Sequence, residues 1–156
     1  MRLIATVVLA ASVVLGTSAC NLVSPQTTTK LYDASDGVSG RVGDLKIRNA
    51  VIISGDGTDG NLLVSVTNEG GAHSLTIQYG EGDSNTVETV IPKGATVSFG
   101  ADGEEPILLE GMDAELGALL PVFFQYGDET GVELLVPVLD GTLPEYSEFV
   151  PSGEAE

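Results

Sequence analysis

The sequence contains little of the chemistry that most enzymes and metal proteins use. In 156 residues it has no tryptophan, one cysteine, one histidine and two methionines. Catalysis by a Ser-His-Asp or Cys-His group needs a histidine within reach of the nucleophile. The one histidine, His73, follows the glycines of Glu69 to Ser74 and is expected to be a solvated loop residue. We therefore assign no catalytic residue and expect a protein that is not an enzyme.

Basic residues are scarce as well, with six Lys and Arg against 23 Asp and Glu. Without Arg2, which lies in the first 19 residues, five basic residues remain and the formal charge is −18. A domain of this charge is repelled by phosphate backbones. Nucleic acid is therefore excluded as a partner. The charge does not prevent folding, because the 42% hydrophobic content is sufficient for a folded core.

The first 19 residues have the layout of a secretory signal peptide. Arg2 gives a positive start, and an apolar run from Leu3 to Gly16 leads to Thr17-Ser18-Ala19-Cys20. This layout is typical of export, and the run is shorter than the ~20 apolar residues that a membrane helix needs. Small residues directly before a cysteine predict lipoprotein processing at Cys20. An ordinary secreted protein with an incidental cysteine is the alternative.

Cys20 has no partner for an intramolecular disulfide, because it is the one cysteine in the chain. An unpaired thiol outside the cytoplasm is a liability unless it is modified. We therefore expect lipid, such as palmitate, on Cys20 and a protein anchored at the outer face of the plasma membrane. The polar, Thr-rich residues that follow predict a flexible tether.

The rest of the chain predicts an all-β sandwich of the cupredoxin or immunoglobulin-like kind, with about eight strands. Short runs of Val, Ile and Leu alternate with Gly, Asn and Asp, as in sandwiches and barrels. The expected strands are 44–53, 62–67, 74–78, 86–91, 96–99, 107–109, 120–126 and 132–138. In the first of these, Leu45, Ile47, Val51 and Ile53 are expected on one face, and Lys46 and Arg48 on the other.

These patterns divide the chain into four segments. We expect a signal peptide in 1–19, the lipidated cysteine and tether in 20–40, the β-sandwich in 41–146 and a disordered tail in 147–156. The domain is expected to be a monomer that is held at the membrane by the lipid. The sequence leaves open whether a protein partner exists and which protein it is.

Metal sites are poorly supported by the residue types. Cu(I) selects thiolate, thioether and imidazole ligands. After the signal peptide is removed and Cys20 acylated, His73 and Met112 alone supply such groups, so they are weak candidates. The loop from Asp56 to Asn61 has oxygen ligands but lacks the spacing and closing Glu of an EF-hand. We expect no bound cofactor and no metal site.

Several short motifs, in order, give the chain a likeness to a known family. It resembles the PCu(A)C-type periplasmic copper chaperones, which are cupredoxin-like β-sandwiches, and in particular a lipoprotein branch in high-GC Gram-positive bacteria. The motifs of the family are Asn49-Ala50-Val51, 62–68, 91–97, 108–112, Gly117, Pro121-Val122 and 132–138; those of the branch are 32–38, 43–45, Arg48-Asn49 and 138–144.

The resemblance also implies where copper ligands would lie, and the residues depart from it there. In the copper-binding members a His-x-Met pair precedes a Met-Gly-Leu sequence. That pair falls on Pro106 and Leu108, and the methionine before the glycine falls on Glu110. The other pair falls between Gln78 and Ile91, a stretch without His or Met. The resemblance thus implies the fold, whereas the ligands that it would require are missing.

Three functions remain open from the sequence. The first is a membrane-anchored, non-catalytic accessory or binding domain without the metal site. The second is a weak or partner-assisted metal chaperone that uses His73, Met112 and surface carboxylates. The third, an extracellular hydrolase, requires a pocket of convergent polar groups with a strongly shifted carboxylate.

Overall fold

The computed structural model describes residues 35–80, 82 and 85–151, and within them the protein is almost entirely β-strand. The strands are β1 (Val38–Val42), β2 (Leu45–Ile53), β3 (Gly60–Asn68), β4 (His73–Tyr79), β5 (Asn85–Ile91), β6 (Thr96–Phe99), β7 (Ile107–Leu109), β8 (Leu119–Gln125) and β9 (Val132–Leu139). The predicted all-β class is confirmed. The described residues hold nine strands instead of about eight, because β1 was not expected.

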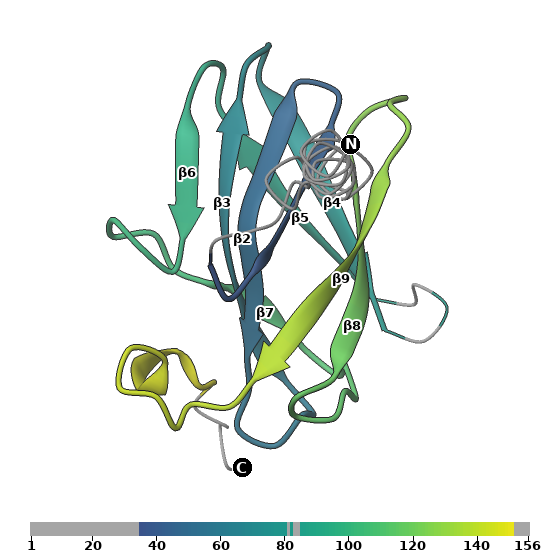
Figure 1. Ribbon diagram of the computed structural model, residues 1–156. Coiled ribbons are helices and arrows are strands. Elements are labelled where there is room, and N and C mark those ends of the chain that lie inside the picture. Colours follow the sequence, from purple (N-terminus) through teal and green to yellow (C-terminus); the bar gives the residue numbers. More distant parts are fainter. Residues whose placement is uncertain (1–34, 81, 83–84, 152–156) are drawn as a thin grey trace, which may run out of the picture. The chain divides into compact units, whose positions relative to one another are not determined.

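Two layers form the fold, and they are joined along one side (Figure 1). The strand order is β5-β4-β8-β9-β2-β3-β6, with β1 added to β2 and β7 added to β3. Neighbours are antiparallel except β2 and β9, which are parallel over Ile52–Val138 and Ile53–Leu139. This short parallel contact connects the layer of β2 and β3 to that of β4 and β8, so the free edges of the sheet are β5 and β6.

Alternating apolar side chains fill the space between the layers. In β3, every second residue from Gly60 to Asn68 is buried, as expected of a strand with one face on a core. Phe124 is among the largest fully buried side chains, and Leu45, Ile52, Leu62 and Ile77 are also inaccessible. The core therefore follows the hydrophobic pattern of the sequence.

The alternation of buried side chains in β2 differs from the expected one, because this strand contains a bulge. Asn49 has φ of +50°, and the pairing with β3 shifts between Arg48 and Val51. Such a bulge turns the following side chains to the other face. The core cluster therefore contains Ala50 and Ile52, whereas Val51 and Ile53 are buried on the outer side of the layer. The prediction that Val51 and Ile53 share a face with Leu45 was wrong.

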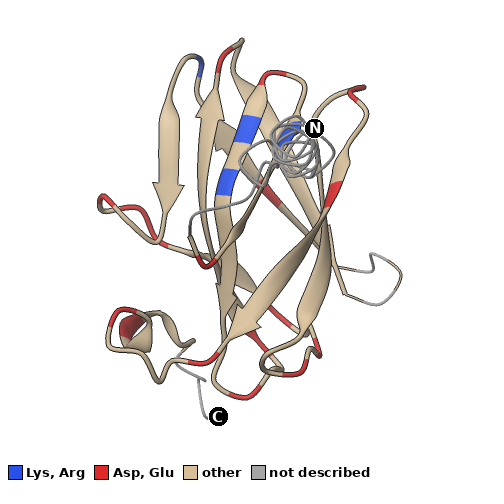
Figure 2. Cartoon of the chain, viewed as in Figure 1, with Lys and Arg blue, Asp and Glu red and all other residues tan. Residues whose placement is uncertain are grey.

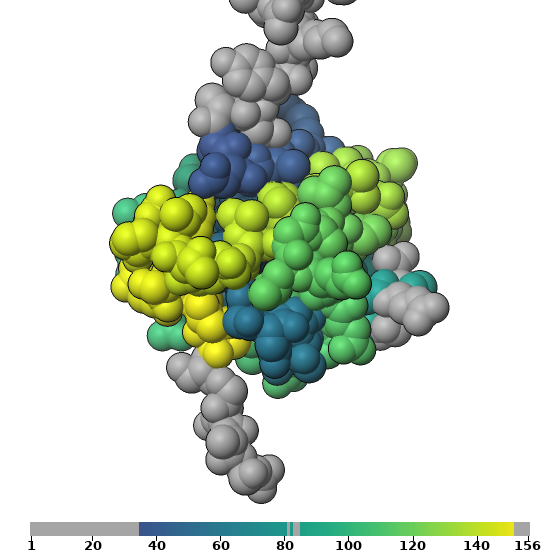
Figure 3. Space-filling model, turned by 60° about the horizontal axis from the view of Figure 1, so that its bottom comes forward, coloured from purple at the N-terminus to yellow at the C-terminus, as the bar shows by residue number. Residues whose placement is uncertain are grey.

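The C-terminal segment lies on that outer side. Asn61, opposite Ile53 in the β2–β3 register, donates from Nδ2 to the carbonyl oxygen of Phe149 at 2.9 Å. Figure 3 shows this segment beside the β2–β3 loop, where a Cβ at Gly55 would stand 3.0 Å from Val150 Cγ1. Residues 147–149, expected to be disordered, instead form a 3₁₀ helix, η3 (Ser147–Phe149).

The domain also begins earlier than expected. β1 starts at Val38, inside the segment that composition assigned to the tether. The backbone N–H of Gly37 donates to Asn49 Oδ1 at 3.0 Å, and Asp36 Oδ2 accepts from the Tyr146 hydroxyl at 2.7 Å. This bond raises the pKa of Tyr146 to about 12. The signal peptide, Cys20 and the tether up to residue 34 lie outside the described residues, among which no helix is long and apolar enough to cross a membrane.

Candidate functional site

The two regions to which the resemblance assigns copper ligands meet at one end of the sandwich. Tyr79, at the end of β4, donates its hydroxyl hydrogen to the Glu110 carbonyl oxygen at 3.2 Å. Asn85, at the start of β5, donates from Nδ2 to the Gly111 carbonyl oxygen at 3.1 Å. The β4–β5 hairpin is therefore fastened to the segment that follows β7. These contacts use backbone acceptors, so sequence patterns could not have indicated them.

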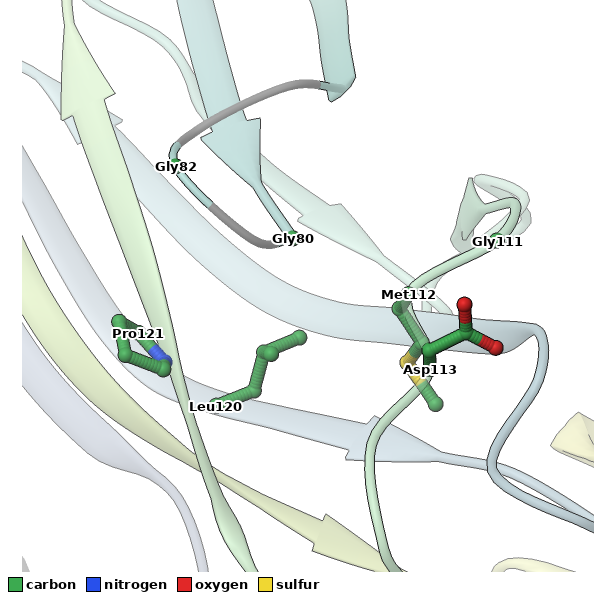
Figure 4. Close-up of a pocket in the computed structure, with 7 residues that line it drawn as sticks. All are labelled: Gly80, Gly82, Gly111, Met112, Asp113, Leu120 and Pro121. Carbon is green, nitrogen blue, oxygen red and sulfur yellow. The ribbon is translucent and has the colours of Figure 1, made fainter.

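A cavity of about 720 Å³ lies beside this junction (Figure 4). Seven described residues line it: three are glycines, Leu120 and Pro121 come from β8, and the segment after β7 supplies the remaining two. Among these seven, Asp113 contributes the one carboxylate and Met112 the one sulfur. The described part of the lining provides neither a nucleophile with its base nor a paired acid and base.

Met112 is held as part of the core. It is 2% exposed, and its backbone N–H donates to the Thr58 carbonyl oxygen at 2.8 Å. Its thioether packs directly over Gly60, where a Cβ would stand 2.9 Å from the sulfur. The sulfur therefore fills a gap in the packing, as methionine does in many cores.

Neither of the two positions to which the resemblance assigns the His-x-Met pair offers a side-chain donor. Pro106 is half-buried before β7, and Leu108 projects outward from β7 with 44% of its surface exposed.

Burial of the nearby Tyr79 ring raises the pKa of its hydroxyl, which stays protonated and serves as a hydrogen-bond donor.

His73 occupies the opposite end of the sandwich. It is the first residue of β4, whereas Tyr79, the last, contacts the segment next to Met112. At ~3.3 Å per residue, β4 places these ends roughly 20 Å apart. His73 and Met112 therefore cannot bind one metal ion together within a single chain.

The surroundings of His73 differ from the solvated loop that the sequence predicted. The side chain is 22% exposed, and its ring lies 4.0 Å from the Tyr126 ring, centroid to centroid. Its Nε2 is buried without a hydrogen-bond partner among the described residues, 3.9 Å from Asp44 Oδ2. The stacking on Tyr126 explains the burial, because β8 passes beside β4 in the sheet.

Carboxylate oxygens in the acidic loop between β2 and β3 accept hydrogen bonds from backbone N–H groups. Asp56 Oδ1 accepts from the Thr58 N–H at 2.9 Å, and Asp59 Oδ1 accepts from the Gly111 N–H at 2.7 Å. The described residues hold no group of three or more His, Cys, Asp or Glu side chains arranged to bind a metal. The loop carboxylates thus have a structural role in the turn and in fastening the segment after β7.

Together, the described residues form an all-β sandwich domain with a glycine-lined cavity at one end. No protein-family model matches the sequence, and no curated protein matches it.

Two solved structures are similar in backbone: the copper-bound PCuAC domain from PmoF2 and the apo PCuAC domain from PmoF1. Each has 14% sequence identity and a TM-score of 0.47, and each match covers 65% of this chain. The matches cover 98% of the PmoF2 domain and 99% of the PmoF1 domain.

Proposed function

We propose that this protein is a lipoprotein, anchored through Cys20 at the outer face of the plasma membrane, whose sandwich is a non-catalytic accessory or binding domain. In this proposal the domain has the chaperone-like architecture without its copper site. The observation that carries it is the separation of His73 and Met112: His73 begins β4, whereas Met112 lies in the segment bonded to Tyr79 at the other end of that strand, roughly 20 Å away. Copper(I) needs two or more soft ligands at one point.

The residues that occupy the expected ligand positions support the same conclusion. Pro106 and Leu108 have no side-chain donor, and the opposing hairpin contributes the hydroxyl of Tyr79 and the amide of Asn85 to backbone carbonyls. Both polar groups are thus engaged in fastening the hairpin. The described lining of the cavity next to them holds one carboxylate, Asp113, and one buried thioether, Met112.

A Cu(I) competition titration tests the missing site. Tag-free protein with Cys20→Ser is titrated against a chromophoric Cu(I) chelator, which removes the thiol as a possible ligand. We expect the chelator to keep the copper at a one-to-one ratio of protein to metal. Tight stoichiometric withdrawal of copper by the protein would refute the proposal, and Met112→Leu and His73→Ala variants would then show which end binds.

Anchoring is tested separately in cells. Wild-type protein is expected in the membrane fraction and in the detergent phase after phase separation, whereas Cys20→Ser is expected in the soluble fraction. Release of the wild-type protein into the medium would contradict the proposed anchor without bearing on the metal site.

A further inference from the structure

The described Lys and Arg residues of this acidic protein lie on one side of the sandwich (Figure 2). Among the described residues there are four, Arg41 on β1, Lys46 and Arg48 on β2, and Lys93 in the turn before β6. The full chain has a formal charge of −17, and acids occupy most of the other turns. A positive area on such a molecule is therefore a local exception.

The strand registers place hydroxyl groups beside these cations. Arg48 lies opposite Ser65, which lies opposite Ser98; Lys46 lies opposite Thr67, which lies opposite Thr96. The paired hydroxyl oxygens are 3.1 Å apart in the serine row and 3.0 Å apart in the threonine row. We call this outward surface of β1, β2, β3 and β6 the basic face.

A net positive charge remains on the basic face after its internal ion pairs are counted. Glu69 accepts from Lys46 and from Arg41, and the contact with Lys46 is the main reason why the pKa of Glu69 is lowered. Arg48 is exposed and forms no ion pair with a described residue. A hollow of about 250 Å³ on this layer is lined by Asn49, Ser65 and Ser98 together with Leu63, Val64, Phe99, Gly100 and Ala101.

The tether joins the domain at this same face. The N–H of Gly37 is bonded to the side chain of Asn49, the residue after Arg48. Fourteen residues separate Cys20 from Ser35, the first described residue. A random coil of fourteen residues spans roughly 20 Å on average. A lipid on Cys20 would therefore keep the neighbourhood of Arg48 close to the lipid head groups.

We propose that the basic face is turned toward the membrane and contacts the phosphates of anionic lipid head groups. This inference rests on the proposed lipid anchor. The whole domain is repelled by an anionic surface, but charges beyond ~8 Å are screened at physiological salt, so the nearest residues decide the orientation of a tethered domain. Arg and hydroxyl groups are suited to phosphate oxygens. The outer surface of β8 and β9, with the exposed Leu119 and Leu135, then faces away from the membrane.

Energy transfer between the protein and labelled lipid tests this orientation. The one native thiol is acylated in the lipidated protein, so a single introduced cysteine can carry a donor dye. One variant is Thr96→Cys on the basic face, and the other is Thr86→Cys, exposed on β5. Each lipidated protein is reconstituted in vesicles of phosphatidylcholine, with or without phosphatidylglycerol, that contain a head-group acceptor dye.

We expect transfer from position 96 to exceed that from position 86 by about twofold with phosphatidylglycerol, and the difference to shrink at high salt. Arg48→Gln should abolish the difference. Val90→Glu, which makes the same change of one charge at an exposed position on β5, should leave it unchanged. Equal transfer from both positions, or a difference that is the same without phosphatidylglycerol, would overturn the proposal and favour a soluble acidic partner for the basic face.

Flotation of the vesicles separates failure of the orientation from failure of the anchor. Lipidated wild-type protein should float with the vesicles, and Cys20→Ser should not. Protein that floats without a difference in transfer refutes the orientation alone, whereas lipidated protein that does not float refutes both.

Discussion

The outer surface of the β2–β3 layer has two halves, of which one is charged and exposed and the other is apolar and covered. One half is the basic face, where Lys46 and Arg48 project into solvent. The other half begins after the bulge at Asn49, where Val51 and Ile53 are covered completely. The comparison teaches that one strand can serve stability at one end and leave its other end free for contacts. The bulge is what allows both uses within nine residues.

The largest expected effect is at the apolar half. Ile53→Ala removes a fully buried side chain, so we expect the free energy of unfolding to fall by about 2–4 kcal/mol. Denaturant unfolding measures it. Val90→Ala, at a position that is 67% exposed, is the control and should change the free energy by about 0.5 kcal/mol or less. A similar loss in both variants would contradict the distinction.

The bulge that divides the halves comes next. Asn49→Val puts a β-branched residue at φ of +50° and removes the bond to the Gly37 N–H, so we expect a loss of about 1–3 kcal/mol. Asn49→Gly keeps the backbone conformation accessible and should cost less, because it loses mainly the hydrogen bond. Equal unfolding midpoints for the two variants would show that the positive φ is unimportant for stability.

A smaller effect is expected where the C-terminal segment is fastened. Asn61→Ala removes the hydrogen bond to Phe149 and should lower the free energy of unfolding by about 1 kcal/mol. It should also speed limited proteolysis within the C-terminal segment. Thr67→Ala on the basic face removes an exposed hydroxyl pair and is the matched control, with little expected change. If Thr67→Ala were the more harmful, the two halves would not differ as described.

The smallest effect concerns pH and the basic face itself. Lys46 and Arg41 hold the pKa of Glu69 below its ordinary 4.5, so the charged carboxylate favours the folded state. This contribution is complete above pH 4.5 and is lost as the pH falls through the lowered value. Glu69→Gln should therefore reduce stability slightly at neutral pH and not in acid, and added salt should diminish the difference. An equal loss at neutral and acid pH would argue against the ion pairs.

Much of the fold could be predicted from the sequence because local patterns determine it. The strand 96–99 and the strand 107–109 have the predicted bounds, and the other expected strands differ by two residues or fewer at each end. Val, Ile and Leu bounded by Gly, Asn and Asp were sufficient for this. β1 was missed because Gly40 interrupts its short apolar pattern, and its strand character depends on pairing with β2.

The remaining features are contacts between distant segments. The parallel pairing of β2 with β9 joins residues more than eighty positions apart, and no local signal indicates it. The bulge at Asn49 also has no clear signature, since the alternation continues through it in the sequence. For the candidate site, the residue types Pro106 and Leu108, which offer no side-chain donor, could be read directly, whereas the separation of His73 from Met112 required the fold. The outward side chains of Lys46 and Arg48 were predicted; their alignment with the hydroxyl rows was not.

The open edge at β5 has a consequence for copies that the proposed lipid anchor would hold on one membrane. This strand has seven residues, one acid, and neither lysine nor proline to discourage a second strand from pairing with it. Anchored copies would meet far more often than molecules in free solution. The large negative charge of each copy then opposes this pairing, because domains of like charge repel one another. In concentrated salt that repulsion is screened, so we expect self-association of this protein, where it occurs, to begin along β5.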